Sequence, residues 1–115
     1  MKEMRNEIEY KDKKYNLVFN LNVMEEIQDE YGTLDKWGAL TDGSKGEPNA
    51  KAVIFGFTCM INEGIDIDNE ENGTSIQPLT HKQVARILTE IGLREATKQM
   101  NKTVIESTKS EEKNV

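Results

Sequence analysis

The sequence predicts an α+β protein, mainly α, in which an N-terminal β-hairpin packs on a bundle of about four to five helices. Apolar residues alternate before residue 20 and then recur at helical spacing. Asparagine, threonine and glycine stand where helices begin or end. The chain has 115 residues, enough for one hydrophobic core and too few for two. We therefore expect one globular domain over residues 1–105.

The first predicted element is a β-hairpin over residues 7–19. The segments EIEY and KYNLVF contain β-branched and aromatic residues and flank a short polar turn. Two strands alone are only marginally stable, so the hairpin needs a helix to cover its apolar face.

A helix over residues 21–31 follows directly. Asn20 or Asn22 can cap its start, and Gly32 can adopt the left-handed conformation that ends it. Its apolar residues repeat at helical spacing: Leu21, Met24, Ile27 and Tyr31.

Further helices are expected over residues 33–40, 50–63, 81–91 and 93–105. Thr33 and Asn49 are the predicted N-caps of the first two, and Gly64 is expected to end the second. Thr80 and Gln83 have the spacing of a capping box at the start of the third. Residues 106–115, ESTKSEEKNV, are predicted to be a flexible C-terminal tail.

The segment NEGIDIDNEENGTS, residues 62–75, is expected to be an acidic loop. It contains acids and no base, in a chain whose net charge is −6. Asp68, Glu70, Asn72 and Gly73 match positions 1, 3, 5 and 6 of a calcium-binding EF-hand loop. Leu79, however, occupies the position of the essential bidentate glutamate. A solvated loop is therefore preferred to a calcium site.

Residues that could carry catalysis or bind a metal or cofactor are sparse. His81 is the only histidine, and no second histidine or cysteine lies at metal-ligand spacing from it. Cys59 lies in the run VIFGFTCMI, which predicts a small buried side chain rather than a nucleophile. We expect a protein that is not an enzyme and has no cofactor or metal.

The sequence also predicts a cytoplasmic protein without membrane contact. No apolar run is long enough to cross a bilayer, and MKEMRNEIEY lacks the apolar stretch of a secretory signal.

Charge placement on two predicted helices is more informative. One helix carries an acidic set without a base, namely Glu25, Glu26, Asp29 and Glu30. The last helix carries a basic set, namely Arg94, Lys98 and Lys102. Like charges at i,i+4 spacing destabilise a helix by a few tenths of a kcal/mol per pair, which suggests that each set faces an opposite charge. That charge lies in this chain or in another copy, and the alternative is two ordinary solvated faces.

Two kinds of apolar side chain have a structural and a functional interpretation. Trp37 is interpreted as a core residue rather than an interface anchor. Met24, Met60 and Met100 are either core residues or adaptable contacts for an irregular partner.

The order of these elements resembles a known family. EIEYKDKKYNLVFNLNVMEEIQDEYG, a short helix with DKW, an apolar helix ending in MINEG, and PLTHKQVARILTEIG before a final helix are similar to small tail assembly chaperones of long-tailed phages and prophages of Gram-positive bacteria. The similarity covers residues 7–108.

The resemblance implies a self-associating, non-enzymatic protein of the bacterial host cytoplasm that is absent from the mature virion. It would coat the tape measure protein and recruit tail tube protein. The charged sets would then mediate its contacts.

The sequence leaves two other functions to consider. One is a small acidic phage-encoded inhibitor that mimics DNA and binds a host nucleic-acid-binding protein through residues 62–75 and the acidic helix. The other is a helix-turn-helix over residues 80–105, but its turn at Gly92 is too short. No nucleic-acid binding by this chain is expected.

Overall fold

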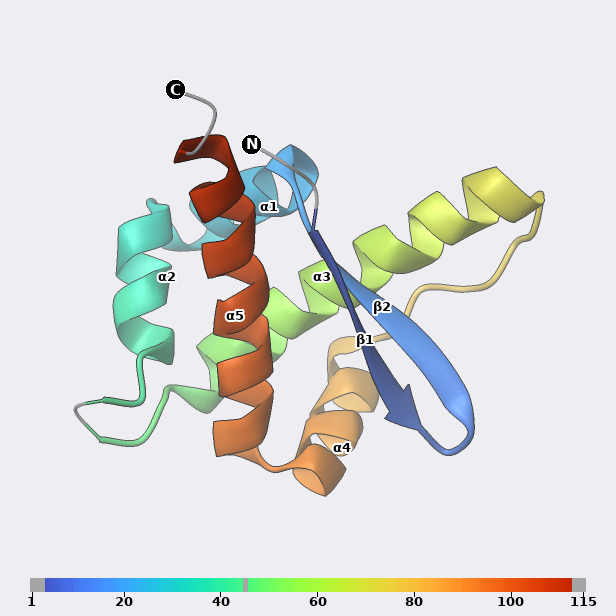
Figure 1. Cartoon of the computed structure of the whole chain (residues 1–115). Coiled ribbons are helices and arrows are strands. Elements are labelled where there is room, and N and C mark those ends of the chain that lie inside the picture. Colours follow the sequence, from blue (N-terminus) through green and yellow to red (C-terminus); the bar gives the residue numbers. More distant parts are fainter. Residues whose placement is uncertain (1–3, 45, 113–115) are drawn as a thin grey trace.

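The computed structural model describes residues 4–44 and 46–112, which form a two-stranded hairpin followed by five helices (Figure 1). The predicted class, α+β and mainly α, is confirmed. The strands are β1 (Met4–Tyr10) and β2 (Lys13–Phe19). The helices are α1 (Leu21–Tyr31), α2 (Leu34–Thr41), α3 (Ala50–Asn72), α4 (His81–Ile91) and α5 (Leu93–Glu112).

The two strands are antiparallel, and Tyr10 lies opposite Lys13. Lys11 and Asp12 form the turn with φ values of 49° and 65°. Positive φ at both central residues is the geometry of a tight turn whose twist matches that of the strands. The hairpin begins at Met4, three residues before the predicted start.

The C-terminal half of the second strand is buried on both of its faces. Leu17, Val18 and Phe19 are all fully buried, although successive side chains of a strand point in opposite directions. Helices α3 and α5 both pack on β2. This part of the hairpin therefore belongs to the hydrophobic core and does not only cover it.

Helix α3 is the centre of the fold and contacts β2 and every other helix. Figure 1 shows it crossing behind α5 and the hairpin. Two of its glycines permit close approach. A Cβ at Gly56 would overlap the ring of Trp37, and one at Gly64 would overlap the carbonyl oxygen of Asn16. Gly64 therefore serves packing inside the helix.

The prediction that Gly64 ends this helix is wrong. The prediction that residues 62–75 form a loop is also wrong for residues 62–72, which are helical. Gly73 ends the helix instead, with a left-handed φ of 64° and a backbone N–H bond to Asn69. Ile65 is buried, and the Asn16 amide donates to the Asp68 carboxylate at 3.1 Å. Contacts with the hairpin thus extend the helix beyond its glycine.

The prediction of a flexible tail over residues 106–115 is wrong as far as residue 112. Helix α5 continues to Glu112, and residues 113–115 lie outside the described part of the chain. Thr103 and Ser107 are buried, and the Asn6 amide donates to the hydroxyl oxygen of Thr103. Packing beside β1 therefore supports a helical segment that is polar in sequence.

The predicted N-caps of the helices are confirmed. Asn20, rather than Asn22, accepts a bond from the backbone of Val23, and Thr33 and Asn49 cap α2 and α3. Thr80 and Gln83 form the capping box of α4.

The core contains several residues whose roles were open. Trp37 is 1% exposed, and its Nε1 donates to the carbonyl of Ala52 at 2.9 Å. Cys59 is buried as predicted. Met60 and Met100 are fully buried, so these two are core residues and not partner contacts. Met24 is half-buried against the core.

Candidate partner-binding surfaces

The first surface is the acidic face of α1, which consists of Glu25, Glu26, Asp29 and Glu30. All four residues are exposed, because α1 turns Val23 and Ile27 into the core. The helix has no basic residue in its last turn to balance the helix dipole. Partial burial and the charge of Glu30 together raise the pKa of Tyr31. The acidic face is therefore an electrostatically unfavourable surface in the isolated chain.

The second surface is the basic row of α5, which consists of Arg94, Lys98 and Lys102. All three residues are exposed. The ammonium of Lys102 lies 3.9 Å from the carboxylate of Glu106, one turn later. The Lys102 side chain is 66% exposed and the Glu106 side chain 36%, so solvent screens the pair and it contributes little stability.

The structure does not bring these two surfaces together. In the described part of the chain, α1 packs mainly on β2, α2 and α3, whereas α5 packs mainly on the hairpin, α3 and α4. The acidic face and the basic row therefore do not neutralise each other within one copy.

A groove between α2 and α5 borders the basic row. Figure 1 shows the two helices beside each other with α3 crossing behind α5. The larger part of the groove has a volume of about 450 Å³ and is lined by Trp37, Gly38, Ala39, Val104 and Ile105, among others. We call it the α2–α5 groove.

A smaller hollow of about 220 Å³ extends this groove along α5. Asn101 lines both parts, and Arg94 and Lys98 line the smaller one. Two of the three predicted basic residues therefore belong to the groove. Sequence reasoning missed the groove itself, because it depends on how far α2 stands from α5.

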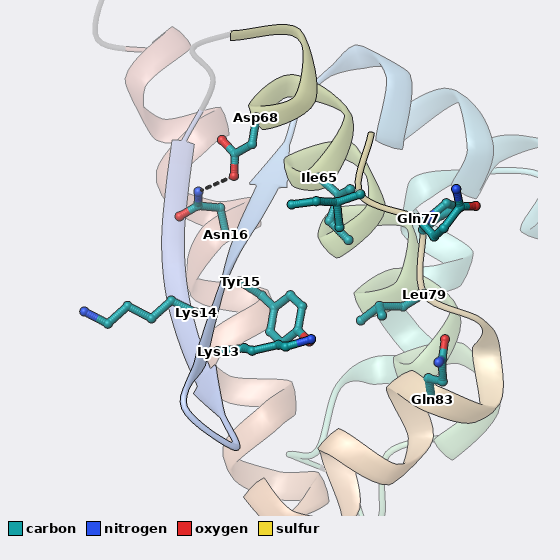
Figure 2. Close-up of a pocket in the computed structure, with 11 residues that line it drawn as sticks. Lys13, Lys14, Tyr15, Asn16, Ile65, Asp68, Gln77, Leu79 and Gln83 are labelled. Atoms are coloured by element: carbon teal, nitrogen blue, oxygen red, sulfur yellow. Dashed lines mark hydrogen bonds between the residues drawn. The ribbon is translucent and has the colours of Figure 1, made fainter. Parts of the chain in front are cut away.

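A cleft of about 510 Å³ lies between β2, the C-terminal half of α3 and the segment that leads into α4. We call it the hairpin cleft. Figure 2 shows Tyr15 and Leu79 pointing toward each other across it, with the Asn16–Asp68 hydrogen bond at one end. Lys14 points away from the cleft in this view.

Two asparagines of α3 hold the far wall of the hairpin cleft. The Asn62 side chain accepts from the N–H of Leu79 at 2.8 Å and donates to its carbonyl at 3.0 Å. Asn69, two turns later, makes the same pair of bonds with Ile76, both at 3.0 Å. The available signal was two asparagines seven residues apart in a helix, where asparagine is not favoured.

Two acids that were expected to be solvated have polar partners instead. The Glu63 carboxylate accepts from the side-chain amides of Asn20 and Asn22 at 2.6 and 2.9 Å. Asp68 accepts from Asn16. These bonds connect α3 to the hairpin and to the start of α1, so part of the acidic segment has a structural role.

The described residues include no group of three or more histidine, cysteine, aspartate or glutamate side chains placed to hold a metal ion. Burial, with a smaller contribution from Glu26, raises the pKa of the Cys59 thiol far above its usual value. A thiol in this state is a poor nucleophile.

Within the same part of the chain, every helix is too short or too polar to cross a lipid bilayer.

No protein-family model, curated protein or solved structure matches the chain. What the protein binds is therefore inferred from its own surfaces. The strongest candidates are the acidic face, the basic row and the α2–α5 groove.

Proposed function

We propose that the protein is a non-enzymatic phage tail assembly chaperone. It coats the tape measure protein in the bacterial cytoplasm and assists polymerisation of the tail tube, without remaining in the mature virion. The observation that carries this proposal is the separation of two exposed, oppositely charged surfaces on different helices, the acidic face and the basic row. The resemblance of the element order to this family points the same way.

The separation of these surfaces suits a protein that covers a filament. When two different patches of one molecule bind each other, the contact is heterologous, and it generates an open chain of copies unless the rotation closes a ring. The acidic face of one copy would meet the basic row of the next. Opposite charges would then relieve the i,i+4 repulsion within each helix.

Co-expression with the tape measure protein of the same genome tests the proposal. We expect the two proteins to co-purify, and light scattering to give a mass that corresponds to many copies on one tape measure chain. A chain that elutes alone as a small species, beside an insoluble tape measure protein, would contradict the proposal.

A charge reversal tests the contact between copies. Lys98→Glu combined with Lys102→Glu should disrupt assembly while the circular dichroism spectrum stays unchanged, since both side chains are exposed. Lys82→Glu is the control, because Lys82 is exposed on α4. Unchanged oligomer size and unchanged tape measure binding in the double variant would exclude the basic row from assembly.

The second candidate function is a DNA-mimicking inhibitor of a host nucleic-acid-binding protein, favoured by the acidic face of α1. Against it, Glu63 and Asp68 are hydrogen-bonded to asparagines, which reduces the freely exposed negative surface. Salt-sensitive capture of a basic host protein that is lost on Glu25→Lys would support this function instead.

A further inference from the structure

We infer that the α2–α5 groove is the docking site for an amphipathic helix of the partner protein, with acidic side chains along one flank of that helix. This inference rests on the proposed function only for the identity of the partner, which would be the tape measure protein. The shape and the charge of the groove are independent of it.

The shape of the groove suits a helix. Gly38 and Ala39 form a low wall on α2, and a Cβ placed at Gly38 would have no neighbour within 4 Å. Val104 and Ile105 form the apolar wall on α5, and Ile105 is 60% exposed. Small residues on one wall let the backbone of a third helix approach closely, as in helix-in-groove recognition.

The length of the groove corresponds to about two turns of a partner helix. Helix α2 has 8 residues, which at the usual rise makes a wall about 12 Å long. Trp37 forms the base of the groove and is held in place, because it donates to the Ala52 carbonyl and packs against Gly56. A partner helix therefore meets a preformed surface.

The two rims of the groove carry opposite charges. Arg94 and Lys98 line the smaller hollow on the α5 side, and Asp35 and Asp42 line the larger part on the α2 side. A helix with acidic residues facing α5 and basic residues facing α2 would match both rims in one direction only. The charge pattern therefore selects the orientation of the partner helix.

A second copy of this chain is a poorer occupant. The exposed side of α1 offers one large apolar side chain, Leu21, to an apolar groove. The acidic face can contact the exterior of the basic row, but it would leave Ala39 and Ile105 uncovered. A partner helix with an apolar face covers them.

Binding is measured through Trp37, the only tryptophan of the chain, which lines the groove. The probe is a capped leucine–alanine peptide of about 18 residues, with glutamates along one flank and lysines along the other. The control peptide has the same composition with the charges of the two flanks mixed. We expect a saturable change in tryptophan fluorescence with the probe, and affinity for the control peptide at least about tenfold weaker.

Two protein variants sharpen the test. Ala39→Arg fills the groove at an exposed helical position and should abolish binding of the probe without unfolding the protein. Lys98→Glu should weaken binding of the probe. A peptide with glutamate at the turn facing residue 98 replaced by lysine should restore it.

The possible outcomes separate the groove from the proposed function. Equal binding of both peptides, or binding that Ala39→Arg leaves intact, overturns the inference. Dissociation of a self-assembled oligomer by Ala39→Arg also overturns it, because the groove would then be a contact between copies. If the probe binds but the tape measure protein does not co-purify, the groove stands and the proposed function fails. If the tape measure protein co-purifies but the probe does not bind, the proposed function stands and the groove is not the docking site.

Discussion

Asn62 binds both backbone polar groups of Leu79, accepting from its N–H at 2.8 Å and donating to its carbonyl at 3.0 Å. The Asn62 side chain thus makes the two backbone hydrogen bonds that a neighbouring strand would otherwise make with Leu79. Asn69 does the same for Ile76. The irregular segment between α3 and α4 is thereby held in place as a wall of the hairpin cleft.

Replacing Asn62 with alanine should detach this wall. The backbone groups of half-buried Leu79 lose their partners, so the free energy of unfolding should fall by about 1–3 kcal/mol. Amide hydrogen exchange at Leu79 should accelerate as well. Asn69→Ala is the matched control, and its effect should be smaller because Ile76 is 60% exposed. If urea denaturation gives the same loss of unfolding free energy for both variants, solvent exposure of Ile76 does not reduce the contribution of its hydrogen bonds.

Two helical glycines should respond to alanine in opposite directions. At Gly56 the methyl group overlaps Trp37 and crowds Met100, so Gly56→Ala should destabilise the protein by about 1–3 kcal/mol. At Gly38 the methyl group has open space, and Gly38→Ala should stabilise by about 0.5–1 kcal/mol through the higher helix propensity of alanine. Thermal unfolding of both variants checks the pair. Stabilisation by Gly56→Ala would contradict the close approach of Trp37 to α3, and destabilisation by Gly38→Ala would contradict the open space at Gly38.

The buried thiol of Cys59 should make stability fall at alkaline pH. Burial raises its pKa in the folded protein, whereas in the unfolded chain it ionises near pH 8.5. The contribution of the neutral thiol is therefore complete below about pH 8.5 and declines above it, by up to about 1.4 kcal/mol per pH unit.

Urea denaturation between pH 7.5 and 9.5 measures this slope. Cys59→Ala should be less stable at neutral pH but should show a shallower decline. In the native wild-type protein, the thiol should also react with Ellman's reagent only as fast as the chain unfolds. Rapid reaction under native conditions would mean that Cys59 is accessible.

Removing repulsion from the acidic face should stabilise the chain and weaken its assembly. Asp29→Lys places a cation four residues after Glu25 and near the C-terminal end of α1, where helix dipole and ion pair both favour it. We expect a gain of about 0.5–1 kcal/mol in unfolding free energy together with a smaller sedimentation coefficient.

Glu90→Lys is the control for the change in net charge, because Glu90 is exposed near the end of α4. It should leave sedimentation unchanged. If Asp29→Lys stabilises the protein but leaves assembly intact, the acidic face is simply a solvated surface.

Much of the fold was predictable because its signals are local. A cap is a bond between residues three apart, so Thr33, Asn49 and Thr80 could be identified as helix starts directly. The exposed charges of α1 and α5 were equally readable, since they follow from which side of each helix is apolar. The same reasoning failed at Gly64, because a glycine that stops a helix and one that admits a neighbouring backbone look alike in sequence.

By itself, the sequence determined the order and type of the elements, their N-caps and the two charged surfaces. These depend on side chains within one or two turns of one another. The tertiary structure alone decided that α3 continues past Gly64, that Asn62 binds Leu79, and that α2 and α5 leave a groove between them. Each of these depends on contacts between segments far apart in the chain, whose energies compensate for local sequence that does not favour them.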